Sequence, residues 1–292
     1  LHPAFQFNGE ELGFWVAKFS ASASDLVTGC SASINNSNES LIVKIAPNEP
    51  IWVRVNNNAS FRISSLMKEK TNIYGWFPSE LDSHLMKSVE WGAIAYLSVS
   101  KFGANDEVWN NAYINLVTGC SSISVDGEDE SSCITFETEN GQKASTTHNI
   151  YGIYDMSGSA WHATMANYNK ISRLSNFDDL LATLEPKYIN RYTTSIDDLL
   201  GGSGMDYNKN SYGDAIYETS FNASRYNGSE WSGLSNGSWY NDRSYLATTN
   251  APWISRGGYY SSNIAAGLFV ISQSTGGQST TDTWRPILTP LK

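Results

Sequence analysis

The sequence has few cysteines and histidines and no segment that could span a membrane. Its 292 residues include only three cysteines and four histidines, and no two cysteines form a Cys-x-x-Cys pair. A structural zinc site is therefore not expected. No apolar run approaches the roughly 18 residues of a membrane span, and no secretory hydrophobic segment is present. We expect no membrane insertion in this segment, and we expect any export signal or anchor to lie upstream of Leu1.

Positive charge is also scarce. Nineteen Lys and Arg stand against 29 Asp and Glu, which gives a net charge of −10. A nucleic-acid partner is not expected, because binding to phosphates needs clustered Lys and Arg, and an anionic membrane surface is disfavoured for the same reason. Aromatic residues, in contrast, make up 13% of the chain. They indicate a packed core and aromatic anchors on the surface rather than disorder.

Two of the three cysteines bracket a polar loop. Cys120 and Cys133 flank a stretch rich in Ser, Asp and Glu, and a disulfide that closes such a loop would contribute about 3 kcal/mol. The alternative is two unpaired thiols, and the partner of Cys30 stays open. Frequent Asn-x-Ser/Thr sequences and few lysines are typical of an extracellular protein.

The apolar pattern predicts short strands in the N-terminal part of the chain. Residues 13–19 (GFWVAKF) have the pattern of a strand buried on both faces, and residues 41–45 and 51–55 have the pattern of two more strands. The Pro-Asn-Glu-Pro sequence of residues 47–50 predicts a turn between them. Residues 256–288 are expected to form short strands and loops.

Two segments predict helices. Residues 87–101 place Trp91, Ile94, Ala95 and Ser98 on one face, and Gly103 follows their end. Residues 177–184 predict a second helix, because 175–178 resembles a capping box and Pro186 stops it.

The length favours one domain over residues 1–292, although 292 residues could also hold two small ones. Residues 201–250 are rich in Gly, Ser, Asn and Tyr and are interpreted as a surface excursion or insertion.

Four blocks, in order, resemble the formylglycine-generating-enzyme (sulfatase-modifying factor) superfamily. They are residues 13–19, 84–103 (HLMKSVEWGAIAYLSVSKFG), 149–163 (NIYGIYDMSGSAWHA) and 256–269 (RGGYYSSNIAAGLF), the last followed by TWRPIL at 283–288. The third block is the most diagnostic of the four.

The resemblance implies an α+β, C-type-lectin-like fold with twisted antiparallel sheets, two main helices and long irregular loops. It implies that the following residues specify this fold: Trp91, Gly152, Tyr154, Asp155, Met156, Gly158, Trp161, Arg256, Gly257, Gly258 and Arg285. The blocks resemble a non-catalytic branch of the superfamily that is found in bacterial pilin-type proteins and phage tail receptor-binding proteins.

The metal ligands of the family's enzymes have no counterpart in the sequence. The oxidase binds copper through two cysteines that would fall in or just after residues 259–267, where this chain has none. None of the four histidines lies four residues before a Glu, the spacing that the iron-dependent branch often uses. Ser159 and His162 replace the Asn and Glu of the family's calcium site, so no catalytic residue and no cofactor is expected. Calcium remains an option at the acidic run 126–130, whose alternative is a solvated loop.

In this fold the ligand surface is built from loops near the C-terminus. Aromatic side chains beside hydroxyls and amides suit both a protein receptor and a sugar; the alternative is an ordinary set of polar loops. The candidate ligand-binding residues are Trp239, Tyr240, Tyr259, Tyr260, Ser261, Ser262, Asn263, Gln273, Ser274, Thr275 and Gln278.

These patterns favour an extracellular recognition domain at the cell or virion surface. It would be an adhesin or the receptor-binding tip of a pilus, as in a minor pilin, or of a phage tail fibre. Its partners would be a cell-surface glycan or protein and the other subunits of the fibre or pilus. A structural filament or virion subunit is the first alternative, and a metal-dependent oxidase or oxygenase of the same superfamily is the second.

Overall fold

The computed structural model describes residues 1–23, 41–69, 74–121, 132–174, 177–193, 212–220, 238–262 and 265–292. Over these residues the chain is a mixed α+β protein with four α-helices and several small, mainly antiparallel sheets. The α+β class expected from the sequence is therefore confirmed.

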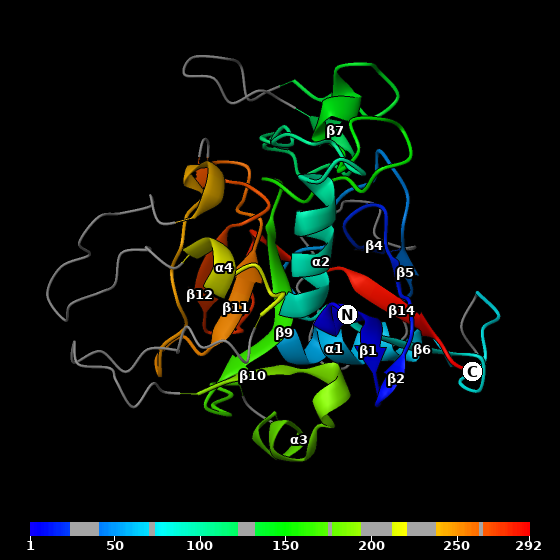
Figure 1. The fold of residues 1–292 in the computed structure, drawn as a ribbon, viewed down its shortest axis with the longest axis vertical. Coiled ribbons are helices and arrows are strands. Elements are labelled where there is room, and N and C mark those ends of the chain that lie inside the picture. The colour runs from blue at the N-terminus through cyan, green and yellow to red at the C-terminus, as the bar shows by residue number, and fades with distance from the viewer. Residues whose placement is uncertain are drawn as a thin grey trace, which may run out of the picture.

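The largest sheet is organised around β9 (Trp161–Tyr168), which is buried along almost its whole length. One edge of β9 pairs antiparallel with β11 (Trp253–Arg256), which pairs with β12 (Ile271–Ser274). The other edge pairs in parallel with β10 (Asn190–Tyr192) at one end and β13 (Asp282–Thr283) at the other. The loop after β11 therefore emerges next to the start of β9 (Figure 1).

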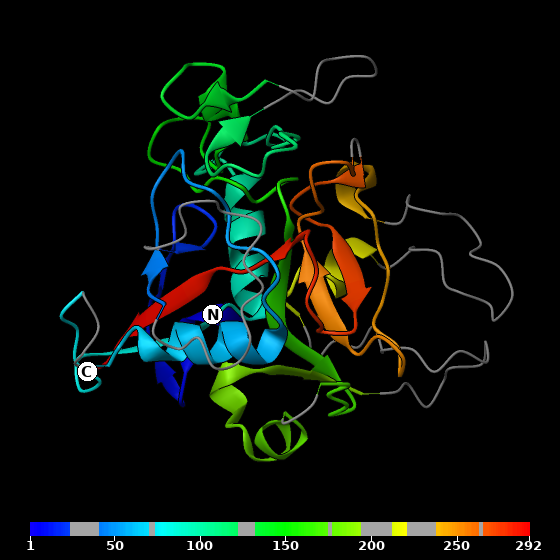
Figure 2. The ribbon, with the colours of Figure 1, turned by 180° about the vertical axis from the view of Figure 1, so that it is seen from behind.

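A second sheet holds β14 (Pro286–Pro290) between β3 (Trp15–Val16) and β6 (Leu81–Leu85). Helix α1 (Asn57–Leu66) packs against β6 and β9. Helix α2 (Ser88–Ser98) joins the two sheets, because its Trp91 and Ile94 share a core cluster with Ile287 of β14 and with Phe269. Figures 1 and 2 show α1 and α2 from opposite sides.

The remaining elements are short. Within the described ranges they are β1 (Gln6–Phe7), β2 (Glu10–Glu11), β4 (Ser22–Ala23), β5 (Val43–Lys44), β7 (Cys120–Ser121), β8 (Ile134–Thr135), α3 (Asp178–Thr183), α4 (Tyr217–Ser220) and the 3-10 turns at Pro3–Phe5, Gly141–Ala144, Pro186–Tyr188 and Trp239–Asn241. Among the helices that the structure describes, none has the length and apolarity to cross a membrane.

The helix predictions agree closely with the structure. Helix α2 begins one residue after its N-cap Lys87, and all four residues of its predicted face are buried. Helix α3 lies within the predicted 177–184, and Pro186 follows it. The proposed capping box of α3 begins at residue 175, outside the described residues.

All three strand predictions for this part of the chain are too long, and residues 41–45 form a strand only at Val43–Lys44. Of residues 13–19 only Trp15–Val16 form a strand, at the edge of its sheet, and the Trp15 side chain is 72% exposed. Residues 51–55 are buried but irregular, because the Trp52 N–H donates to Ala21 and the Ile51 N–H to Leu116 instead of to one neighbouring strand. An apolar run predicts burial here, but it does not predict the partner of the backbone.

The first helix was not predicted. The side chain of Asn56 accepts a hydrogen bond from the Ala59 N–H and caps α1. Within residues 201–250, which the sequence analysis interprets as a surface excursion or insertion, residues 214–216 are buried.

Candidate ligand-binding surface

Asp155, in the third resemblance block, is a buried junction between three chain segments. Its carboxylate accepts hydrogen bonds from the Asn111 side chain (3.0 Å), the Gly119 N–H (2.9 Å) and the Ser20 N–H (3.2 Å). Burial raises the pKa of Asp155, although the nearby Arg285 and these donors oppose the rise. The side chain is enclosed on all sides, so its role is to hold the fold together.

The two residues that replace the family's calcium ligands are also part of the interior. His162 is fully buried beside the Trp91 ring, and its Nε2 lies 3.0 Å from the Ser20 hydroxyl. Burial and the neighbouring Arg285 lower the pKa of His162 well below 6.5, so the imidazole is neutral. Ser159 is buried in a turn with φ 66°.

Across the described ranges, no group of three or more His, Cys, Asp or Glu side chains is arranged to hold a metal ion. The acidic run 126–130 lies outside these ranges.

The arginine of the fourth block, Arg256, links β11 to α2 and to the segment before α4. It donates to the Asp214 carbonyl (2.9 Å) and to the Ser88 hydroxyl (3.2 Å), with its guanidinium 5.9 Å from the centre of the Trp91 ring. Burial raises the pKa of Asp214 from 3.8 to about 6, against opposing hydrogen bonds from Tyr192 and Ile216. Arg256 therefore holds the interior together and is not available to a ligand.

A second buried polar network surrounds His84 of β6. Its Nε2 lies 3.0 Å from Glu90 and its Nδ1 lies 3.3 Å from Asp82, which also binds Lys68 and the Tyr188 hydroxyl. Burial opposes the charge on His84, but Glu90 and Asp82 outweigh it and raise the pKa. Although carboxylate-imidazole groupings serve as catalysts elsewhere, the His84 side chain is completely enclosed and stacked on Phe7 (5.3 Å), which leaves no access for a substrate.

The buried groups around Asp155, Arg256 and His84 contrast with a cluster of aromatic residues and an arginine whose members are partly exposed. The Arg243 cluster consists of Trp161, Arg243, Tyr245, Tyr259 and Tyr260. The rings of Trp161 and Tyr259 are stacked at 5.9 Å, and those of Tyr259 and Tyr260 meet edge to face at 5.3 Å. The Arg243 guanidinium lies 4.0 Å from the Tyr245 ring centre and 5.5 Å from that of Trp161.

The sheet and its loops position this cluster. Trp161 begins β9, and Tyr259 and Tyr260 lie in the loop after β11, which ends opposite His162. The Tyr260 N–H donates to the Ser159 carbonyl (2.8 Å), and the Tyr259 N–H donates to the Ser262 hydroxyl (3.1 Å). These hydrogen bonds hold the backbone of Tyr259 and Tyr260 in place, and the exposed Ser261 follows them in the chain.

The other predicted ligand residues do not join this cluster. Trp239 and Tyr240 are 45% and 41% exposed and pack on Phe269, at ring distances of 5.1 and 6.0 Å. Gln273 and Ser274 pair with Ile254 and Trp253, towards the start of β11 and away from Tyr259.

The remaining predicted residues fall on the nearby loops or outside the described residues. Thr275 and Gln278 are exposed in the loop between β12 and β13. Asn263 lies outside the described residues. The predicted ligand set is therefore divided among three places. The Tyr259 region combines aromatic rings with an arginine, and Trp239 and Tyr240 form a separate aromatic group with Phe269.

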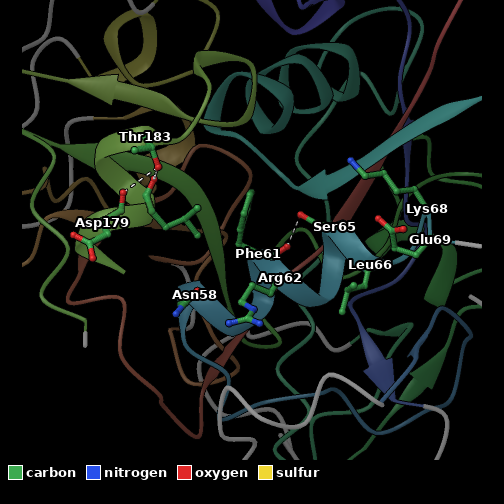
Figure 3. A pocket seen from close by; sticks show the side chains of 10 residues that line it. Asn58, Phe61, Arg62, Ser65, Leu66, Lys68, Glu69, Asp179 and Thr183 are labelled. Atoms are coloured by element: carbon green, nitrogen blue, oxygen red, sulfur yellow. Dashed lines mark hydrogen bonds between the residues drawn. The ribbon is translucent and has the colours of Figure 1, made fainter. Parts of the chain in front are cut away.

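An open groove of about 680 Å³ lies between α1 and α3 (Figure 3). Its lining contains two basic residues and two acidic residues, Arg62, Lys68, Glu69 and Asp179. Its apolar lining is formed by Phe61, Leu66 and Leu180. Lys68 is already paired with Asp82 at 2.9 Å. The groove carries no concentration of one charge and no aromatic platform.

Sequence reasoning missed Arg243 and Tyr245 as site residues and assigned Trp161 to the fold signature alone. Trp161 begins β9, but the sequence analysis predicts no strand there, so its position gave no signal of a site. Arg243 gave none, since it is an isolated cation in a Tyr- and Ser-rich stretch.

The Cys120–Cys133 disulfide is confirmed and joins β7 to the residue before β8. Comparisons with protein-family models and with curated protein sequences find no match for this chain.

Proposed function

We propose that this protein is a non-catalytic, extracellular recognition domain that binds a cell-surface glycan or protein through the Arg243 cluster. The observation that carries the proposal is the cluster itself, in which four partly exposed aromatic rings and a cation are packed at one end of the main sheet. Tyrosine and tryptophan supply a large contact area at a small cost in conformational entropy, which is the way that antibody paratopes bind.

The rigid mounting of the cluster supports this role. Backbone hydrogen bonds hold Tyr260 against Ser159, and the Gly267 N–H donates to Gly257 across the base of the loop (3.2 Å). A surface that is already ordered loses little conformational freedom when it binds, which leaves more of the contact energy as affinity.

The disulfide supports an extracellular location, because disulfides persist mainly in oxidising compartments. The finer fold assignment, a C-type-lectin-like domain of the non-catalytic branch, is part of the same proposal. It rests on the four sequence blocks, whose signature residues Asp155, Arg256 and Arg285 all make buried hydrogen bonds between distant segments.

The test is a binding assay against immobilised saccharides and receptor proteins with two matched variants. Tyr259→Ala removes a ring from the centre of the cluster, and Tyr151→Ala removes one that is 87% exposed on a separate loop. We expect Tyr259→Ala to weaken binding at least tenfold, in line with the cost of removing an aromatic anchor, and Tyr151→Ala to leave it unchanged. Equal binding by all three proteins contradicts the proposal.

A structural filament or virion subunit is a second candidate. It is favoured by Trp15 and Phe102, large apolar side chains that are more than 70% exposed on separate elements. Burial of these two side chains, rather than of Tyr259, in a purified assembly would support it.

A further inference from the structure

Arg243 is a half-buried cation without an acidic partner. Among the residues that the structure describes, no carboxylate pairs with it, and its Nε is buried without a hydrogen-bond acceptor. Burial lowers the pKa of Arg243, and only the hydroxyl groups of Tyr245 and Tyr259 act in the opposite direction. A guanidinium stays protonated under such conditions, so an uncompensated positive charge is held in the cluster.

This situation contrasts with the two arginines of the fold signature. Asp155 raises the pKa of Arg285, and Asp214 raises the pKa of Arg256. Each of these two charges therefore has an acidic neighbour inside the protein. The chain carries a net charge of −10, and acidic groups are abundant. In the described part of the chain no carboxylate pairs with Arg243, so its charge is available to an anion from outside the protein.

The geometry favours a planar anion. A guanidinium that stacks on aromatic faces keeps its N–H edges in the plane of the stack, where they can donate two parallel hydrogen bonds to a carboxylate. The guanidinium is half-buried beside the Tyr245 and Trp161 rings, and its lower exposure to water strengthens such a pair. The neighbouring Trp161 and Tyr259 rings and the Ser261 and Ser262 hydroxyls suit a sugar ring that bears the carboxylate.

On the basis of the proposed function, we infer that the Arg243 cluster selects saccharides that carry a carboxylate, such as uronic or sialic acids. Arg243 binds the carboxylate, and the exposed parts of the Trp161 and Tyr259 rings lie against the sugar ring. Neutral saccharides would then bind only through the aromatic rings and the hydroxyls, and more weakly.

The experiment measures equilibrium binding of the full chain to three probes: trigalacturonate, a hyaluronan tetrasaccharide and 3′-sialyllactose. Each is paired with its methyl ester or carboxyl-reduced counterpart, which keeps the rings and removes the charge. We expect at least one acidic probe to bind tenfold or more tightly than its neutral counterpart, since a hydrogen-bonded charge pair contributes on this scale. Raising the salt concentration should reduce the preference.

Variants assign the preference to one side chain. Arg243→Gln should bind the acidic and neutral probes equally, and Arg243→Lys should recover part of the preference because it keeps the charge but not the planar donor pair. Arg62→Gln removes an exposed arginine on α1 and should bind as the unaltered protein does. Thermal melting of each variant shows whether it is folded.

The outcomes separate this inference from the proposed function. Saccharide binding that Tyr259→Ala weakens, without any acidic preference or with a preference that Arg243→Gln retains, overturns the inference and leaves the recognition function standing. Binding of a poly-glutamate peptide in place of every saccharide overturns the choice of a sugar. No binding to any probe, together with no effect of Tyr259→Ala on receptor proteins, overturns both.

Discussion

The guanidinium of Arg256 donates a hydrogen bond to the backbone carbonyl of Asp214 across 2.9 Å. These residues are 42 positions apart, and their contact anchors the segment before α4 to the main sheet. Arg256 also stabilises the charged form of the Asp214 carboxyl, whose pKa burial raises to about 6. A carboxyl pKa above its ordinary 3.8 stabilises the fold below that value, and this contribution is lost as the pH rises through 6.

Arg256→Met should therefore destabilise the protein more at pH 8 than at pH 5. Without Arg256 the pKa of Asp214 rises further, so a buried, uncompensated carboxylate must form above neutrality. We expect a loss of about 3–5 kcal/mol at pH 8, measured by urea unfolding. Arg62→Met, on the exposed face of α1, serves as the control. Losses of equal size at both pH values would show that the charge of Arg256 is not what matters.

The raised pKa of His84 should make the stability of the protein depend on pH. Its raised pKa means that His84 stabilises the fold fully below 6.5 and loses this contribution as the pH rises through the folded-state value. The free-energy difference between the native protein and His84→Gln should thus shrink from pH 6 to pH 9. A difference that stays constant in denaturant titrations at the two pH values contradicts this prediction.

The network around His84 predicts a loss of stability in acid. Burial opposes the ionisation of Asp82 and Glu90, but His84 and the neighbouring lysines outweigh it and hold both pKa values at about 2. Their contribution is complete above about pH 4.5 and is lost as the pH falls towards 2. In Asp82→Asn the stability should fall less between pH 4.5 and pH 2, because the amide does not titrate. An acid titration followed by circular dichroism would measure the shift of the unfolding midpoint. An unchanged acid midpoint would contradict the assignment.

Gly158 should not accept a side chain. Its φ is +74°, and a Cβ there would lie 2.6 Å from the Asn111 carbonyl oxygen. Gly75 has a similar φ of +68° with open space around it. An alanine there adds backbone strain without crowding, so Gly75→Ala is the control for the effect of strain alone. Gly75→Ala should cost about 1 kcal/mol, and Gly158→Ala several times as much. Equal losses in thermal unfolding would mean that the loop of Asn111 moves away.

Loss of the Cys120–Cys133 disulfide should lower the free energy of unfolding by about 3 kcal/mol. The disulfide closes a loop between two residues that are 13 positions apart in the sequence. The double variant Cys120→Ser, Cys133→Ser would measure this effect by thermal unfolding. Reduction of the native protein should lower its melting temperature by the same amount, and no change on reduction would contradict the role of the disulfide.

The sequence predicted those parts of the fold in which local pattern and packing agree. The α2 face was predictable because Trp91, Ile94, Ala95 and Ser98 recur at helical spacing and all point inwards. Residues 51–55 were misassigned because an apolar run does not show whether its N–H groups will meet one strand or several loops. Helix α1 was missed because its sequence, NNASFRISSL, has a high content of Asn and Ser and depends on the Asn56 cap and on contacts with β6.

The site was predictable only in part, and for a related reason. Tyr259 and Tyr260 were identified from a local Tyr- and Ser-rich sequence. Trp161, Arg243 and Tyr245 join them only because β9 lies beside β11 and the chain before β12 crosses the same end of the sheet. These residues come together through the pairing of strands that are distant in the sequence, and their spacing along the chain does not predict it.

Hydrogen exchange with and without bound ligand tests the central claim most directly, because it shows where the ligand lies. With the saccharide or receptor found in the binding assay, we expect slower amide exchange in the segments that contain Arg243, Tyr245 and residues 257–262. Exchange in the exposed loop around Tyr151 should not change. Slower exchange confined to α1 and α3, which line the groove of Figure 3, would contradict recognition through the Arg243 cluster.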